Sequence, residues 1–237
     1  MSGGGSINSA QIHPSSVVED GVVIGENVKV GPFCHIFGDV IIGKNTTISS
    51  FNYIEGPTKI GKNNFIGPNC VIGTPGEHKT AKSVGEIIIG DNNIIRELTV
   101  IQRGCGDRNT EIRNNCFIMD HVHFGHDVLV DDNVTIAPNV VLGGHTVVLE
   151  GATIGIGSST HQFSTIGAFS MIGMNSTITR DVLPFYLVSG SPGSFMRWNT
   201  VQLNLHEFGE SPTDSQLQPF MDKFMKYSKR KHVVRNE

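Results

Sequence analysis

Histidines gather in one stretch of the 237-residue chain, and two further motifs follow at a regular interval. The three motifs are MDHVHFGHD at Met119–Asp127, LGGH at Leu142–His145 and HQF at His161–Phe163. Within them, His126, Gly144 and Gln162 follow one another at intervals of 18 residues. A histidine side chain, with an ordinary pKa of about 6.5, gains and loses a proton near neutral pH. The pattern therefore indicates general acid–base chemistry.

If 18 residues make one lap of a regular coil, these three residues stack in one column, a strand spacing apart. We expect His126 to act as a general base and Asp127 to orient or support its imidazolium form. The backbone N–H of Gly144 is expected to stabilise an oxyanion. The other polar residues of this band are expected to hold the acceptor, a sugar: His123, His145, His161 and Gln162. Together these groups are what acyl transfer requires, whereas a single histidine would be better explained as a polar surface residue.

The scaffold that must position these residues is visible as a period of six. Every sixth residue over Ile12–Ile72 is Ile or Val, and the register resumes over Ile89–Ile101 and Ile112–Ile178, where Thr160 is its one polar member. This period fits neither an α-helix nor a long alternating strand. It predicts an all-β fold, a parallel β-helix with three short strands in each lap. Aliphatic side chains point inward, and Gly, Asn and Asp occupy corners where positive φ is common.

Two breaks in the register predict loops at the corners of the coil. The interval from Ile72 to Ile89 exceeds one repeat by eleven residues, and that from Ile101 to Ile112 exceeds it by five. The first insertion contains the polar segment TPGEHKTAK. Because loops on a rigid scaffold often carry function, we expect these insertions to contribute to a site.

The period ends at Pro184, which divides the chain into a β-helix over residues 7–184 and an extension over 185–237. Residues 185–210 are expected to form an irregular crossover. A helix is predicted to begin near Ser211–Asp214, because apolar residues follow at helical spacing: Leu217, Phe220, Met221, Phe224 and Met225. The basic tail KYSKRKHVVRNE is interpreted as a solvated end rather than as a contact with an acidic carrier protein.

Composition excludes several other classes of function. The formal net charge of −4 argues against nucleic acid as a partner. No apolar run reaches the roughly 20 residues that a membrane helix needs, so no stable membrane insertion is expected. The N-terminus MSGGGS does not resemble a secretory signal, which favours a cytoplasmic location. The four cysteines are expected to be reduced and mostly buried. We expect neither a metal ion nor a cofactor.

Four segments carry a resemblance to a known family: IRELTVIQRG at Ile95–Gly104, HVHFGHDVLV at His121–Val130, NVVLGGH at Asn139–His145 and HQFSTIGAFSMIGM at His161–Met174. They are similar to motifs of the acyl-[acyl-carrier-protein]–UDP-N-acetylglucosamine O-acyltransferases, which begin lipid A synthesis. The resemblance covers about residues 10–199. It implies a left-handed β-helix, because these enzymes belong to the hexapeptide-repeat transferases.

The resemblance also implies roles for individual residues and partners. His126 would be the catalytic base and Gly144 the oxyanion donor, while His123, His145, His161 and Gln162 would line the sugar site. Asn199 matches an asparagine of the family's nucleotide site. The donor would be a 3-hydroxyacyl group on acyl carrier protein, and the acceptor a nucleotide sugar such as UDP-N-acetylglucosamine. The site would lie between subunits of a homotrimer.

This chain departs from the family pattern at two places. Leu205 and His206 stand where the family has arginines, one of which contacts the nucleotide's phosphates. The family's acidic substrate-binding residue in the first insertion has no clear counterpart, although Glu77 and Lys79 lie near its position. His206 and Lys79 are therefore included among the candidate substrate-binding residues.

Three alternatives remain open at this point. A sugar N-acyltransferase could use acyl-CoA or acyl carrier protein to modify a nucleotide-linked amino sugar on the same scaffold. A zinc lyase like the β-helical carbonic anhydrases could use His121, His126 and His78 as ligands. A non-catalytic scaffold could retain the fold alone, but the intact His126 argues against this third alternative.

Overall fold

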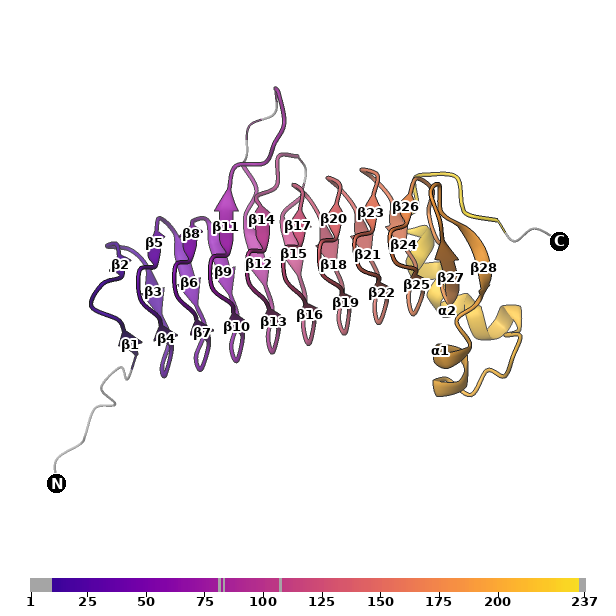
Figure 1. Cartoon of the computed structure of the whole chain (residues 1–237), viewed down its shortest axis with the longest axis horizontal. Coiled ribbons are helices and arrows are strands. Elements are labelled where there is room, and N and C mark those ends of the chain that lie inside the picture. The colour runs from indigo at the N-terminus through magenta and orange to yellow at the C-terminus, as the bar shows by residue number, and fades with distance from the viewer. Residues whose placement is uncertain (1–9, 81, 83, 107, 235–237) are drawn as a thin grey trace.

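The computed structural model describes residues 10–80, 82, 84–106 and 108–234. Three sheets form the walls of an elongated β-helix, and each lap of the chain contributes one short strand to each wall. Figure 1 shows the laps stacked in sequence order along the long axis, with the helices at the C-terminal end. The hexapeptide period therefore corresponds to one wall of the coil.

The strands of each wall are parallel neighbours, apart from one final antiparallel strand. The first wall contains β1 (Gln11–Ile12), β4 (Lys29–Val30), β7 (Thr47–Ile48), β10 (Phe65–Ile66), β13 (Ile94–Ile95), β16 (Phe117–Ile118), β19 (Thr135–Ile136), β22 (Thr153–Ile154), β25 (Met171–Ile172), β27 (Tyr186–Ser189) and the antiparallel β28 (Ser194–Trp198). The second wall contains β2 (Val17–Val18), β5 (His35–Phe37), β8 (Tyr53–Glu55), β11 (Val71–Thr74), β14 (Val100–Gln102), β17 (His123–Phe124), β20 (Val141–Leu142), β23 (Ser159–Thr160) and β26 (Thr177–Ile178). The third wall contains β3 (Val23–Ile24), β6 (Val40–Ile42), β9 (Thr58–Ile60), β12 (Ile87–Ile89), β15 (Thr110–Ile112), β18 (Leu129–Val130), β21 (Val147–Val148) and β24 (Thr165–Ile166).

The residues of the six-residue register point into the coil and form its core. Ile36, Ile66 and Phe124 are each 0% exposed, whereas Ile12 in the first lap is 42% exposed. Asparagine is the commonest non-glycine residue at the described corners with positive φ, as at Asn45. The inward aliphatic positions and the left-handed corners are thus as the sequence predicts.

Thr160, the polar member of the register, is accommodated by hydrogen bonds. Its side chain is 6% exposed, and its Oγ1 lies 2.8 Å from Oγ1 of Thr146. Thr160 Oγ1 accepts from the Gly143 amide at 3.2 Å, and the Thr146 hydroxyl donates to the Gly143 carbonyl at 2.7 Å. Buried hydroxyls need hydrogen-bond partners. The hydroxyls of Thr160 and Thr146 bond to each other, and both also bond to the backbone of Gly143, which holds this peptide in place.

Both insertions leave the register of the coil intact. Ile66 pairs with Ile95 across the first insertion, and Ile101 pairs with Phe124 across the second. The extra residues leave the coil as loops between β11 and β12 and between β14 and β15, on the same side of the molecule (Figure 1). The predicted corner loops are confirmed.

The β-helix does not end at Pro184. Ile166 bridges to Val182, and Met171 and Ile172 pair in parallel with Leu187 and Val188 of β27. These partners are 16 residues apart instead of 18, so the last lap is shortened and the period of six is lost while the pairing continues. The expectation of an irregular crossover over residues 185–210 is therefore wrong: this segment contains β27, β28 and the helix α1 (Thr200–Leu205).

The predicted amphipathic helix is present as α2 (Asp214–Met225). Thr213 caps its N-terminus, and the Gln216 side chain completes a capping box. Phe224 is fully buried outside the coil, in a cluster with Leu129, Val147, Leu149 and Ala168. Lys223 reaches the buried carboxylate of Asp131 at 2.5 Å. The helix is therefore fastened to the outer face of the third wall, and neither described helix has the length and apolar character of a membrane span.

Phe224→Ala is expected to loosen α2 without unwinding the β-helix. Removing a buried phenylalanine side chain costs about 3–5 kcal/mol, because a cavity replaces its packing contacts. Hydrogen exchange of the α2 backbone amides should accelerate, while exchange of the coil strands stays slow. Met225→Ala is the matched control, because its side chain is 56% exposed. Equal protection of α2 in both variants would contradict the role of Phe224.

The four cysteines, Cys34, Cys70, Cys105 and Cys116, are buried and joined by no disulfide, as expected from the sequence. Burial raises the pKa of the Cys70 thiol to about 11 and that of Cys116 to about 12. These two thiols are therefore held in the protonated, unreactive form at neutral pH.

Candidate active site

The three histidine motifs meet at one corner of the coil. His123 pairs with Val141, and Val141 pairs with Ser159, so β17, β20 and β23 are successive strands of the second wall. Each strand runs into a turn at its carboxyl end. Backbone hydrogen bonds link these turns, from the His145 amide to the His126 carbonyl at 2.9 Å and from the Phe163 amide to the Gly144 carbonyl at 2.9 Å. The column predicted from the 18-residue interval is confirmed.

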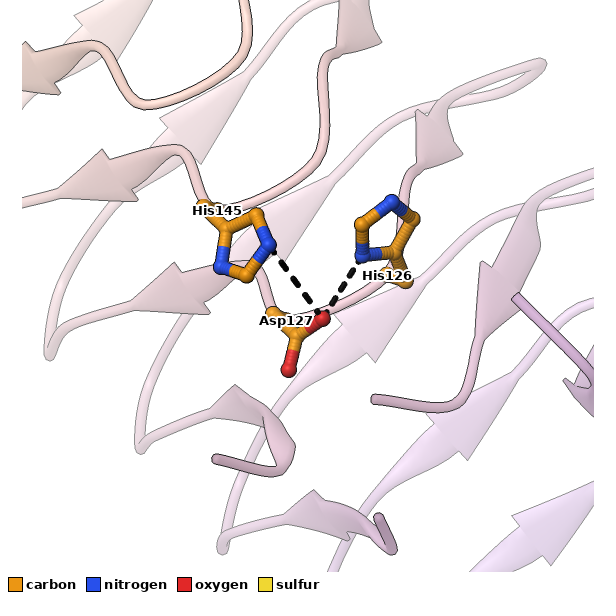
Figure 2. A group of neighbouring side chains, drawn as sticks. All are labelled: His126, Asp127 and His145. Carbon is orange, nitrogen blue, oxygen red and sulfur yellow. Dashed lines mark hydrogen bonds and ion pairs between the residues drawn. The ribbon is translucent and has the colours of Figure 1, made fainter. Parts of the chain in front are cut away.

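His126 is oriented by the residue that follows it. Its ring is nearly buried, and Nδ1 lies 2.6 Å from Oδ2 of Asp127 (Figure 2). Because an ionised carboxylate only accepts hydrogen bonds, Nδ1 is the nitrogen that carries the proton. Nε2 is then left with its lone pair. This is the tautomer that a general base acting through Nε2 requires.

Asp127 is itself held by the second insertion. The amides of Cys105 and Gly106 donate to its two carboxylate oxygens at 3.0 and 3.1 Å, and its own amide donates to the Thr110 hydroxyl at 2.9 Å. Burial raises the pKa of Asp127, but the hydrogen bonds from His126 and the two amides outweigh burial and leave the pKa below its ordinary value. The carboxylate therefore remains ionised beside His126.

Gly144 stands directly in front of the basic nitrogen. A Cβ atom at this position would lie 2.8 Å from Nε2 of His126, closer than such contacts allow. Among the described residues, none accepts a hydrogen bond from the Gly144 amide. A glycine here therefore leaves room for a reacting group next to Nε2 and leaves an N–H available to it.

His145 contacts Asp127 from the other side. Its Nε2 lies 3.6 Å from Oδ2 of Asp127, and its ring stacks on Phe163 with centroids 4.3 Å apart. Burial lowers the pKa of His145, and the positive charges of Arg108 and of protonated His126 lower it further, against the opposing effect of Asp127. His145 thus lies beside His126, with ring centroids 5.0 Å apart, and is not among the residues that line the pocket.

A shallow pocket of about 360 Å³ opens in front of His126 and Gly144. Three further residues expected from the sequence line it, namely His123, His161 and Gln162. Glu77 and Gln102 complete its wall from the first insertion and from the end of β14. Gln102 has no place in the histidine motifs and is not identified from the sequence, although the adjacent register breaks mark this side of the coil as irregular.

The first insertion closes over the catalytic corner. A Cβ atom on Gly76 would lie 2.6 Å from Cβ of His126, so the loop backbone passes against this residue. The ring of His78 makes an edge-to-face contact with His126 at a centroid distance of 5.7 Å. The expectation that both insertions contribute to the site therefore agrees with their placement.

Three other candidate residues lie outside this pocket. Lys79 is exposed in the first insertion. Asn199 precedes α1 and donates a hydrogen bond to the Phe169 carbonyl at 2.9 Å. His206 follows α1, where its Nδ1 bonds to the Gln202 carbonyl at 2.8 Å. Within one chain, none of these three residues lines the pocket in front of His126.

His126, Asp127 and His145 form the one described group whose ligand atoms could surround a metal ion. Its geometry fits a hydrogen bond better than a metal centre. Ligand atoms about 2.0–2.1 Å from a tetrahedral zinc lie about 3.3 Å apart, whereas Nδ1 of His126 and Oδ2 of Asp127 are 2.6 Å apart. The group does not include His121 or His78, which the zinc lyase alternative requires.

The pKa shifts of Asp127 and His145 predict how stability depends on pH. The folded pKa of Asp127 lies below its ordinary value, so its stabilising contribution is complete above about pH 4 and is lost as pH falls through the folded pKa. The folded pKa of His145 is also lowered, so stability falls as pH drops from about 6.5 toward that pKa. Urea unfolding between pH 3 and 8 should show both losses. His145→Asn should remove only the loss of stability that begins near pH 6.5. An unchanged dependence of stability on pH in this variant would contradict the role of His145.

Comparison with known proteins agrees with this geometry. The sequence profile of the family described as bacterial transferase hexapeptide (six repeats) matches residues 8–38, 39–74 and 109–144. An acyl-[acyl-carrier-protein]–UDP-N-acetylglucosamine O-acyltransferase of Sinorhizobium fredii is 39% identical over 198 residues, which cover 82% of this chain and 73% of the relative. The same enzyme of Aliivibrio fischeri is 46% identical over 188 residues, 77% and 71% of the two chains.

This chain belongs to the acyl-[acyl-carrier-protein]–UDP-N-acetylglucosamine O-acyltransferase family. It is an acyltransferase. The solved UDP-N-acetylglucosamine acyltransferase of Francisella novicida superposes with a TM-score of 0.87 at 28% identity, over 94% of both chains. That of Campylobacter jejuni gives a TM-score of 0.86 at 26% identity, over 95% of this chain and all of the other.

Family membership decides between the functions that the sequence leaves open. The predicted fold class, a left-handed parallel β-helix of hexapeptide repeats with a short C-terminal helical extension, is confirmed. The two alternative activities, a sugar N-acyltransferase and a zinc lyase, are not supported, because the relatives are O-acyltransferases. Membership in a family of enzymes also removes the reason to assume a non-catalytic scaffold.

Proposed function

We propose that this protein transfers a 3-hydroxyacyl group from acyl carrier protein to a hydroxyl of UDP-N-acetylglucosamine. The observation that carries the proposal is the placement of Nε2 of His126, which faces Gly144 while Nδ1 is bonded to Asp127. The names of the relatives given above contain acyl-[acyl-carrier-protein] as donor and UDP-N-acetylglucosamine as acceptor. The 3-hydroxy group of the donor belongs to our proposal.

In the proposed reaction, Nε2 of His126 removes the proton from the acceptor hydroxyl as its oxygen attacks the thioester carbon. Negative charge develops on the thioester oxygen, and the Gly144 N–H donates a hydrogen bond to it. Asp127 stabilises the imidazolium that forms. The intermediate then collapses, the carbon–sulfur bond breaks, and the thiol leaves with the proton from His126. No cofactor takes part in this proposal.

Pocket residues His123, His161 and Gln162 are proposed to hold the acceptor sugar. Asn199, His206 and Lys79 do not line this pocket within one chain, and Val141 at its edge is 46% exposed. We therefore propose that a homotrimer completes the site, with a neighbouring subunit supplying these three residues. Light scattering after gel filtration should give the mass of three chains of 25.7 kDa. A location in the cytoplasm, where acyl carrier protein is found, completes the proposal.

The decisive test is a transfer assay whose product reports the bond formed. Purified protein is incubated with 3-hydroxyacyl carrier protein or the matching acyl-CoA, and with UDP-N-acetylglucosamine or its 3-amino analogue. We expect an acylated product from the carrier-protein donor and the hydroxyl sugar, detected by mass spectrometry. Mild base should release the acyl group, since esters hydrolyse under conditions that leave amides intact. A base-stable product, or no transfer from either donor, would contradict the proposal.

A further inference from the structure

The C-terminal tail is a strap (residues 228–233) fastened to the β-helix, and the expectation of a solvated end is wrong for these residues. Asp181, which is 0% exposed, receives hydrogen bonds at Oδ2 from the Ser228 hydroxyl at 2.8 Å and from the amides of Lys229 and Arg230 at 3.0 Å. Val233 donates its amide to the Asp181 carbonyl at 2.8 Å and is only 3% exposed. The strap therefore has a defined position.

This position carries the side chain of Arg230 to the wall of the candidate active site. Its Nε donates to the Thr179 carbonyl at 2.9 Å, and its Nη1 donates to the Gln162 carbonyl at 3.1 Å. The same Nη1 lies 3.0 Å from Nδ1 of His161. His161 and Gln162 both line the pocket in front of His126. Arg230 thus connects the end of the chain to two residues proposed to hold the acceptor.

The contact determines which nitrogen of His161 carries the proton. Nδ1 lies 3.0 Å from Nη1 of Arg230, which only donates, and 3.0 Å from the Gln162 carbonyl oxygen, which only accepts. Because that carbonyl already receives a hydrogen bond from Nη1, the guanidinium favours Nδ1 of His161 as an acceptor. The neutral ring then carries its proton on Nε2. Without Arg230, Nδ1 would keep one other described partner, the Gln162 carbonyl at 3.0 Å, which only accepts. Loss of the guanidinium would therefore move the ring proton from Nε2 to Nδ1.

We propose that Arg230 is a positioning residue for acyl transfer, which holds His161 as the Nε2–H tautomer so that this nitrogen donates a hydrogen bond to an oxygen of the acceptor. The inference rests on the proposed function for the identity of the acceptor. The strap is fastened through Asp181 and backbone amides, so the side chain of Arg230 can be changed without detaching it. A role in positioning is therefore separable from a role in folding.

Arg230→Met removes the donors and keeps an unbranched side chain of similar length. We expect KM for the nucleotide sugar to rise about tenfold with kcat little changed, because one hydrogen bond made in both the ground and transition states is lost. Lys231→Met is the matched control in the same strap, since its side chain is exposed and forms no hydrogen bond or ion pair with the described residues. It should leave both constants unchanged.

A double-mutant cycle with His161→Ala separates positioning from a general structural effect. If Arg230 acts through His161, Arg230→Met should change kcat/KM less than twofold in the His161→Ala background. Nitrogen-15 spectra of histidine-labelled protein should show His161 as the Nε2–H tautomer in the wild type and as the Nδ1–H tautomer in Arg230→Met.

The same loss of kcat/KM in both backgrounds, or an unchanged His161 tautomer, would overturn the proposal. Failure of the proposed function would look different, because wild-type protein would then show no transfer to the nucleotide sugar while the tautomer spectra remained readable. Arg230→Lys provides a second variant: a lysine keeps the charge but not the fork of donors, so we expect at most partial recovery of the KM effect.

Discussion

His126→Ala is expected to lower kcat by about 10²–10⁴, the usual contribution of a positioned general base. The variant removes Nε2, which faces Gly144, and leaves the Asp127 carboxylate with its bonds from Cys105 and Gly106. KM for the nucleotide sugar should change little, because the proposed sugar contacts come from other residues. Steady-state transfer assays at saturating donor and varied acceptor measure both constants.

The control for this variant is His13→Ala, which removes an exposed histidine whose ring forms hydrogen bonds only with Ser15 among the described residues. Its kinetic constants should equal those of the wild type. Thermal unfolding and gel filtration of both variants establish that fold and assembly are retained. If His126→Ala keeps more than a tenth of the wild-type kcat while it folds normally, His126 is not the base.

The sequence predicts the coil well because its period is a direct consequence of winding. An inward side chain must recur once per wall, so buried residues such as Ile36, Ile66 and Phe124 show the register of the coil in the sequence alone. No information about long-range contacts is needed. The same regularity brings His126 and Gly144 together across one lap. Local repetition thus determined a tertiary contact, which sequence patterns seldom do.

What the sequence did not predict lies where the period is broken. The amides that hold Asp127 belong to an insertion, and backbone donors of a loop leave no side-chain pattern to recognise. The shortened last lap loses the period of six while keeping its pairing, so the sequence does not predict β27 as a strand of the coil. The strap depends on Asp181 meeting residues almost 50 positions later. These contacts join segments of different sequence that share no repeat, so no regular spacing in the sequence predicts them.

Gly144→Ala is expected to lower kcat by about 10² even though it keeps the proposed oxyanion donor. The added Cβ would meet Nε2 and Cε1 of His126 at 2.8 and 2.9 Å, so the ring must turn away from its position or the turn must shift. Because a displacement of about 1 Å in a catalytic group can cost about 10²-fold in rate, the predicted loss needs no change in the chemistry. The curve of kcat against pH should keep its shape, with a lower kcat at every pH, since the same base still acts.

Gly209→Ala tests the general cost of replacing a glycine. Gly209 has φ of +71°, so alanine there is strained, but its Cβ would meet nothing within 4 Å. We expect a small loss of stability and an unchanged kcat for this variant, whereas Gly144→Ala should lose activity with little loss of stability. The contrast follows from what each methyl group meets: solvent at residue 209, and the imidazole of the base at residue 144. Wild-type kcat in Gly144→Ala would mean that the space in front of Nε2 is not where the reaction occurs.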